Sequence, residues 1–142
     1  MDALTTLIAA FNRGSLDVPS GFFTARTSFT LNNRSYESML GGSPDDPLIR
    51  MLARGMAGYR TAAKALQYAL QRPVITVESI SEPDASGVRT AEVLVEGELR
   101  DSGQPFAGRA SLRLDCAQLE LTSLGVSCSE EDLARIAASR RA

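Results

Sequence analysis

Residues 88–126 decide the fold, and they read VRTAEVLVEGELRDSGQPFAGRASLRLDCAQLELTSLGV. Apolar and polar residues alternate along most of this stretch, which is typical of β-strands because successive side chains point to opposite faces. Two short segments, 101–104 (DSGQ) and 115–118 (DCAQ), interrupt the alternation and have the composition of turns. The stretch therefore predicts three consecutive antiparallel strands with one apolar and one charged face.

The charged residues of this stretch predict how the strands pair. With Arg100 opposite Pro105, the apolar side chains share one face and the charges share the other, whereas a slip of one residue would mix them. The cross-strand ion pairs predicted on the charged face are Glu96 with Arg109, Glu92 with Arg113, and Arg113 with Glu120. The predicted inner face has small residues at Ala91, Gly97, Gly108, Ala110, Ser123 and Gly125.

The length and composition indicate one globular domain spanning residues 1–142. The 142 residues are 44% hydrophobic and 23% charged, with a formal net charge of −2. This charge does not favour nucleic acid as a partner. No apolar run approaches the ~18 residues of a membrane span, so we expect neither nucleic acid nor a membrane as a partner. The sequence contains no histidine, which excludes a histidine-based catalytic triad or dyad.

The two cysteines, Cys116 and Cys128, are expected to be free thiols. Cys116 falls in the second predicted turn, and Cys128 lies beyond the far end of the strand that leaves it. About ten strand residues at ~3.4 Å each separate them, which is far beyond disulfide reach. Free thiols indicate a reducing compartment, so a cytoplasmic location is expected. Without histidine, neither a metal site nor a cofactor is predicted.

The rest of the chain supplies helices and two further strand regions. The Asn32-Asn33 pair predicts a two-residue hairpin turn, because asparagine tolerates positive φ. Either Ser43 or Asp46 caps a long helix, since a proline follows each of them. The predicted elements are a helix over 3–13, a loop over 15–26, hairpin strands over 27–31 and 34–38, the long helix to about residue 71, a strand over 74–82, and a final helix capped by Ser129, with a frayed tail over 139–142.

These elements predict an α+β fold. A curved antiparallel sheet of about four long strands plus a short hairpin wraps its apolar face around the long helix, with an N-terminal helix beside it. The apolar stripe of the long helix is predicted from Leu48, Leu52, Met56, Tyr59, Ala63, Leu66 and Leu70. Such a cone leaves either a cavity or a close helix contact above the small residues of the inner face.

Three segments carry a family resemblance: LIAAFNRGSLD at 7–17, FFT at 22–24 and FTLNNRSYE at 29–37. In these segments the chain resembles the nuclear transport factor 2-like superfamily, in particular its bacterial SnoaL-like branch. The resemblance implies a cone-shaped, cystatin-like α+β fold, a pocket inside the cone and a homodimer through the outer sheet face. It also implies functions that range from isomerases, epoxide hydrolases, polyketide cyclases and dehydratases to non-enzymatic binding proteins.

The catalytic patterns of that superfamily do not carry over to this sequence, so three functions stay open. The first is a domain that binds a hydrophobic small molecule in an apolar pocket without catalysis. The second is an acid/base enzyme acting on a hydrophobic substrate, for which Glu78 is the candidate base. A third possibility is a structural dimer module. The candidate pocket-lining residues are Tyr36, Tyr59, Thr76, Glu78 and Ser123.

Overall fold

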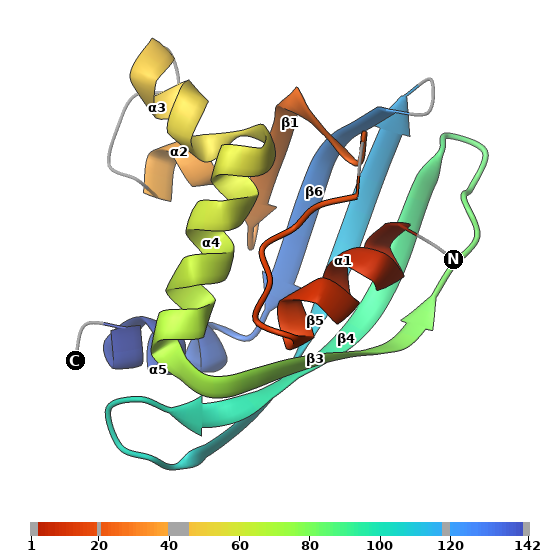
Figure 1. The fold of residues 1–142 in the computed structure, drawn as a ribbon. Helices are drawn as coiled ribbons and strands as arrows, with labels where there is room; N and C mark the ends of the chain where they lie inside the picture. Colours follow the sequence, from red (N-terminus) through yellow and green to blue (C-terminus); the bar gives the residue numbers. More distant parts are fainter. Residues whose placement is uncertain (1–2, 20, 40–45, 118–119, 141–142) are drawn as a thin grey trace.

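The computed structural model describes residues 3–19, 21–39, 46–117 and 120–140, and it confirms the α+β class (Figure 1). The helices and strands in chain order are α1 (Ala3–Asn12), β1 (Phe23–Leu31), β2 (Arg34–Ser35), α2 (Tyr36–Met39), α3 (Pro47–Ala53), α4 (Gly55–Ala69), β3 (Leu70–Ile80), β4 (Val88–Leu99), β5 (Pro105–Ala117), β6 (Glu120–Cys128) and α5 (Glu130–Arg140).

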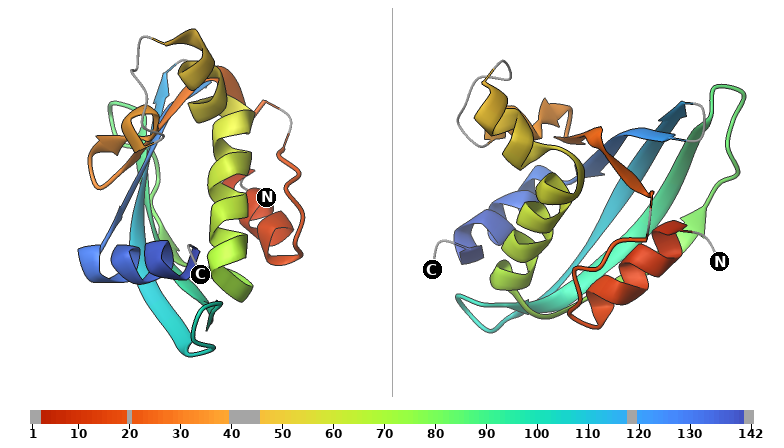
Figure 2. Two further views of the ribbon diagram at one scale, coloured as in Figure 1. Left: turned by 90° about the vertical axis from the view of Figure 1, so that its left-hand side faces the viewer. Right: turned by 45° about the horizontal axis from the view of Figure 1, so that its top comes forward.

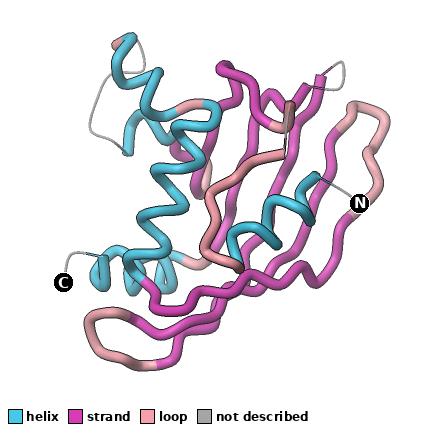
Figure 3. The backbone as a smooth tube through the Cα atoms, in the orientation of Figure 1, coloured by secondary structure: helices cyan, strands magenta, loops and turns pink. Residues whose placement is uncertain are grey.

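The strands form one curved, six-stranded sheet in the order β2-β1-β6-β5-β4-β3. All neighbouring strands are antiparallel except β1 and β6, which are parallel. Helices α1 and α4 lie on the concave face, α5 packs against α4 at one end of the sheet, and no described helix covers the convex face (Figure 2). The segment between α1 and β1 passes between α1 and α4 in the view of Figure 3.

The core consists of two clusters on the concave face. The larger one joins α1 and the start of β1 to the middle of the sheet, and it contains Leu4, Leu7, Ile8, Phe23, Ala91, Val93, Leu114, Leu121 and Leu124. The smaller one lies near α5 and contains Leu70, Leu99 and Phe106, with Leu66 and Ile136 packed against it. The predicted apolar strand face supplies Ala91, Val93, Leu114 and Leu121 of the larger cluster and Leu99 and Phe106 of the smaller one, and the rest of the larger cluster comes mainly from α1.

The predicted long helix is wrong in one respect, because it breaks between α3 and α4. Arg54 has an extended backbone, and Gly55 has φ +62°. A Cβ at Gly55 would lie 2.7 Å from the carbonyl oxygen of Thr24, so glycine is required at this contact. Arg54 also donates a 2.9 Å hydrogen bond to the buried carboxylate of Glu37 in α2. These contacts fix the break in the middle of the apolar pattern.

The break exposes the first part of the predicted stripe, because α3 turns away from the sheet. Leu48, Leu52 and Met56 are exposed rather than buried. Asp46 is the N-cap, since its side chain accepts a 2.9 Å hydrogen bond from the backbone N–H of Leu48. The alternative cap, Ser43, lies outside the described residues.

The β4–β5 register differs by two residues from the predicted one. Val93 lies opposite Ala110 and Glu98 opposite Pro105. The connecting loop covers residues 100–104, whereas the predicted turn covered 101–104. The same side chains stay on the same faces, since a shift of two preserves the alternation. The predicted ion pairs of Glu96 and Glu92 across this hairpin are therefore not formed.

A β-bulge in β6 reverses the faces of its later residues. Asp115 pairs with Ser123 while the next residue, Cys116, pairs with Leu121, so Thr122 is an extra residue in β6. Beyond the bulge, Leu124 faces the concave side, whereas Ser123 and Gly125 face the convex side. The prediction that the latter two belong to the inner face is therefore wrong, as is the pairing of Arg113 with Glu120, because Arg113 lies opposite Gly125.

Two further differences concern short segments. The hairpin turn is confirmed, with φ +50° at Asn32 and +66° at Asn33, but its second strand ends at Ser35 and residues 36–38 belong to α2. Ser139 is fully buried and does not fray: its hydroxyl donates a 2.7 Å hydrogen bond to the carbonyl of Ala69 and accepts a 3.2 Å bond from the N–H of Asp101. The C-terminal helix is thus anchored to the end of α4.

Candidate functional site

The concave face keeps a band of accessible apolar surface between the two core clusters. Three cross-strand pairs form this band, which we call the concave band: Val95 with Gly108, Ala110 with Cys128, and Leu112 with Val126. All six residues are only partly buried, whereas their concave-face neighbours Val93 and Phe106 are buried. The concave-face residues on either side of the band are therefore more deeply buried than the band residues themselves.

Tyr59 is the predicted site residue that does face the concave side. It lies in α4 and packs against the larger core cluster, with its ring centroid 5.4 Å from that of Phe23. Its hydroxyl oxygen is buried and has no hydrogen-bond partner among the described residues. Burial raises the pKa of this hydroxyl above its ordinary value, so Tyr59 remains neutral at physiological pH.

Thr76 and Glu78 lie on the convex face, which corrects their predicted place in the pocket. Their neighbours Ile75 and Val77 pack towards the larger core cluster, so the alternating residues of β3 point to the other side. Glu78 receives hydrogen bonds of 2.9 and 3.3 Å from the guanidinium of Arg109. A general base that is exposed and paired on the convex face cannot act on a ligand held inside the cone.

Ser123 and Tyr36 are also separated from Tyr59. The hydroxyl of Ser123 donates a 3.1 Å hydrogen bond to the carboxylate of Asp115 on the convex face, which corrects its predicted inward orientation. Tyr36 is the first residue of α2 and is partly buried near the β1–β2 hairpin. The structure therefore does not bring the five predicted side chains together.

Asp132 is a concave-face carboxylate that sequence reasoning did not select. It lies in the first turn of α5, where its backbone N–H donates a 3.1 Å hydrogen bond to the hydroxyl of the cap residue Ser129. Its side chain extends to the sheet: a Cβ at Gly108 would lie 2.7 Å from Oδ2 of Asp132. The sequence signal was present as the Ser129-x-x-Asp132 spacing, but that spacing indicated only a helix cap.

Cys128 lies in the same part of the concave band. Burial raises the pKa of its thiol, and the carboxylates of Asp132 and Glu130 raise it further. The thiol is therefore protonated at neutral pH and is a poor nucleophile. Cys116 and Cys128 are both free, as expected, although Cys116 lies in β5 rather than in a turn.

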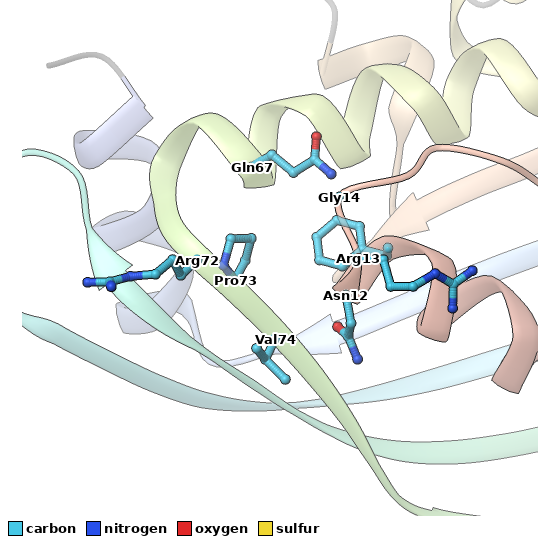
Figure 4. A pocket seen from close by; sticks show the side chains of 8 residues that line it. Asn12, Arg13, Gly14, Gln67, Arg72, Pro73 and Val74 are labelled. Atoms are coloured by element: carbon cyan, nitrogen blue, oxygen red, sulfur yellow. The ribbon is translucent and has the colours of Figure 1, made fainter.

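A second feature is a groove of about 380 Å³ where the C-terminal ends of α1 and α4 meet β3 (Figure 4). Phe11, Gln67, Pro73 and Val74 line it together with Asn12, Arg13, Gly14 and Arg72. The carboxamide of Asn12 bonds both backbone groups of Ile75, accepting from its N–H at 2.8 Å and donating to its carbonyl at 2.9 Å. Arg13 and Arg72 extend away from the groove on opposite sides, so its walls offer no converging charge.

The described residues contain neither a cluster of metal ligands nor a helix that could span a membrane. No group of three or more acidic, cysteine or histidine side chains within the described ranges is placed to hold a metal ion. Within the same part of the chain, none of the helices has the length and apolar character that crossing a bilayer requires.

Several solved structures share this architecture at low sequence identity. A proposed hydroxylase, AclR from Streptomyces galilaeus, matches with a TM-score of 0.66 at 12% identity over 96% of this chain and 79% of its own. A proposed SnoaL-like polyketide cyclase from Jannaschia sp. CCS1 matches with a TM-score of 0.62 at 12% identity over 99% and 92%. A protein of ketosteroid isomerase-like fold from Catenulispora acidiphila, in complex with trimethylamine, matches with a TM-score of 0.63 at 15% identity over 96% and 92%.

These matches confirm the fold that the resemblance implies. The chain has the cone-shaped fold of the nuclear transport factor 2-like superfamily, as found in SnoaL-like and ketosteroid isomerase-like proteins. The sequence itself matches no family model. It also matches no curated protein.

Proposed function

We propose that this chain binds an apolar small molecule on the concave band. The observation that carries the proposal is the partial burial of six adjoining concave-face residues between two well-packed clusters. Exposed apolar surface costs about 25 cal/mol per Å² relative to burial, so a ligand that covers the band gains free energy. The similarity in fold to ligand-processing proteins supports the same conclusion.

A pair of alanines on opposite faces of β5 provides the test. Ala110 lies in the concave band, whereas Ala107 is exposed on the convex face. Binding of the neutral apolar dye Nile red is measured by fluorescence for the parent protein, Ala110→Phe and Ala107→Phe, with circular dichroism to confirm folding. We expect Ala110→Phe to weaken binding about tenfold, or 1.4 kcal/mol, and Ala107→Phe to leave it unchanged. Failure of the parent to bind, or equal loss in both variants, would overturn the proposal.

An acid/base enzyme is the second candidate function, and the position of Asp132 favours it. Glu78 does not serve this function, because it is paired with Arg109 on the convex face. Asp132 instead presents a partly buried carboxylate over the apolar concave band. Exchange of α-protons of small cyclic ketones in D₂O, followed by proton NMR, tests the proposal. Catalysed exchange that Asp132→Asn abolishes would support it, and exchange at the uncatalysed rate would exclude this reaction.

We also propose that two copies associate through the convex face in the cytoplasm. The free cysteines support a reducing compartment, and the convex face carries no described helix. The ion pair Arg109–Glu78 lies on this face. Sedimentation equilibrium at micromolar concentration is the test of association: a monomeric mass would remove the dimer from the proposal.

A further inference from the structure

Asp132 is placed to contact whatever occupies the concave band, and Gly108 makes this placement possible. A methyl group at Gly108 would come within 2.7 Å of Oδ2 of Asp132 and 3.0 Å of Cζ of Phe106. A Cβ almost never approaches other atoms so closely, so any larger residue at this position would displace the carboxylate. The missing side chain thus lets α5 bring its carboxylate onto the sheet at the end of the band.

The Asp132 carboxylate has no partner within the described part of the chain. No hydrogen bond or ion pair given by the structure ends on its oxygens, in contrast to the neighbouring Glu130, which accepts a 3.0 Å bond from Asn32 and pairs with Arg34 at 3.7 Å. Arg135, one turn further along α5, holds its guanidinium 5.2 Å from the ring centroid of Phe106 and forms no ion pair with Asp132. The carboxylate is therefore free to accept hydrogen bonds from a ligand.

The chemistry of the group defines the ligand class. An ionised carboxylate only accepts hydrogen bonds, and its bonds to charged donors are about twice as strong as neutral ones. Glu130 and Glu131 precede Asp132 in the same helical turn, so three carboxylates repel an anion here, against the attraction of Arg135 and of the helix N-terminus. The adjoining band is apolar, with Ala110, Leu112 and Val126 in reach of the body of a small molecule.

We propose that Asp132 is the polar anchor of the concave band and selects apolar molecules that carry a protonated amine. This inference rests on the proposed binding function and names the ligand class for the same site. The amine donates to the Asp132 carboxylate while the hydrocarbon part covers the band. A neutral hydroxyl on the same hydrocarbon is a weaker ligand, and a carboxylate is repelled.

Three naphthalene probes with the same apolar body and different charges separate the effect of charge on binding from that of apolar contact. 1-Naphthylmethylamine is a cation at pH 7, 1-naphthalenemethanol is neutral, and 1-naphthylacetate is an anion. Their binding is measured by ligand-observed NMR to the parent protein, to Asp132→Asn, and to Gly108→Ala, which displaces the carboxylate without removing it. Glu78→Gln is the matched control, because it removes a carboxylate that lies on the convex face, away from the band. There Glu78 accepts hydrogen bonds of 2.9 and 3.3 Å from Arg109.

The expected result is an affinity order of cation, then neutral probe, then anion for the parent protein. Asp132→Asn should weaken amine binding about tenfold and remove the preference over the alcohol, Gly108→Ala should act in the same direction, and Glu78→Gln should keep the parent order. If the affinity order of the probes were unchanged in Asp132→Asn, or if the anion bound the parent most tightly, Asp132 would not be the polar anchor. If no probe binds to the parent protein, the proposed binding function fails as well, which distinguishes the two failures.

Discussion

At the scale of single residues, the unpartnered hydroxyl of Tyr59 is a local cost in the core. Its ring packs against Phe23, but its oxygen is buried without a partner among the described residues. A buried unsatisfied polar group costs about 1–3 kcal/mol. Tyr59→Phe keeps the ring and removes the oxygen, so we expect it to raise the free energy of unfolding by about 1 kcal/mol, measured by urea denaturation at pH 7.

The pH dependence of the same variant gives an independent check. Because burial raises the pKa of Tyr59 in the folded protein, the folded state keeps its proton to higher pH than the unfolded state does. The parent protein should lose stability as the pH rises above the unfolded value of about 10, and Tyr59→Phe should lose less. Tyr68→Phe, at an exposed tyrosine, is the control. A destabilised Tyr59→Phe would show that the hydroxyl has a partner.

Asp84 illustrates a carboxylate that stabilises a turn rather than a site. It accepts hydrogen bonds from the N–H groups of Val88 at 3.0 Å and Ser86 at 2.8 Å, which lower its pKa below the ordinary value. The stability it contributes is present above the unfolded pKa of about 3.9 and is lost as the pH falls through the lower folded pKa. Asp84→Asn should therefore be less stable than the parent at pH 7.

The difference in stability between the parent protein and Asp84→Asn should shrink towards pH 2. Urea denaturation midpoints at pH 7 and pH 2 measure it. Asp101→Asn provides the comparison, because Asp101 is an exposed loop residue whose carboxylate accepts no hydrogen bond given for the described residues. If Asp84→Asn were destabilised equally at both pH values, the ionised carboxylate of Asp84 would not be what stabilises the turn.

Residue faces were predictable from sequence only as far as the alternation held. Leu112 and Val93 follow the strand period and face the concave side as predicted. Ser123 lies one residue beyond a bulge that no turn residue signals, so its face was predicted incorrectly. Asp132 was missed for a different reason: its role depends on Gly108, 24 positions away in the sequence, and only the packing of α5 brings the two together.

At the scale of elements, the free edge of the sheet at β3 is closed by a side chain from α1. The carboxamide of Asn12 bonds the N–H and the carbonyl of Ile75, and so takes the place that another strand would occupy. Each such bond contributes about 0.5–1.5 kcal/mol. Asn12→Ala should lower the free energy of unfolding by about 1–2 kcal/mol and speed hydrogen exchange at the amide of Ile75.

Arg13→Ala is the matched control, because Arg13 is exposed beside Asn12 and no hydrogen bond of its side chain is given among the described residues. Unchanged exchange at Ile75 in Asn12→Ala would mean that the edge is protected by other contacts.

Helix boundaries show where local sequence patterns stop being sufficient. The apolar repeat continues without interruption from α3 into α4, and nothing in its spacing marks Arg54 as the break. The break arises because Gly55 lies against the backbone of Thr24 and because Glu37 binds Arg54. Both contacts join residues that are distant in sequence, whereas the Asn32-Asn33 turn acts locally and was predicted correctly.

At the scale of the whole molecule, the cone depends on α5 closing the end of the sheet. Ser139 links three elements: its hydroxyl bonds the carbonyl of Ala69 at the end of α4 and the N–H of Asp101 after β4. Leu70 and Phe106 of the smaller core cluster lie beneath this end, with Ile136 of α5 packed against them. Loss of the hydroxyl removes both bonds: the N–H of Asp101 loses this partner, and the carbonyl of Ala69 keeps only its 3.0 Å bond from the N–H of Arg100.

Ser139→Ala should therefore lower the free energy of unfolding by about 1–3 kcal/mol and loosen α5 before the sheet unfolds. Limited proteolysis should cut within residues 130–140 in the variant under conditions that leave the parent intact, and Ser127→Ala, at an exposed strand residue, should behave as the parent. Because Asp132 reaches the concave band only while α5 is docked, amine binding should weaken together with protease resistance. Protection of α5 that persists in Ser139→Ala would mean that Ile136 and Phe106 hold the helix without the hydroxyl.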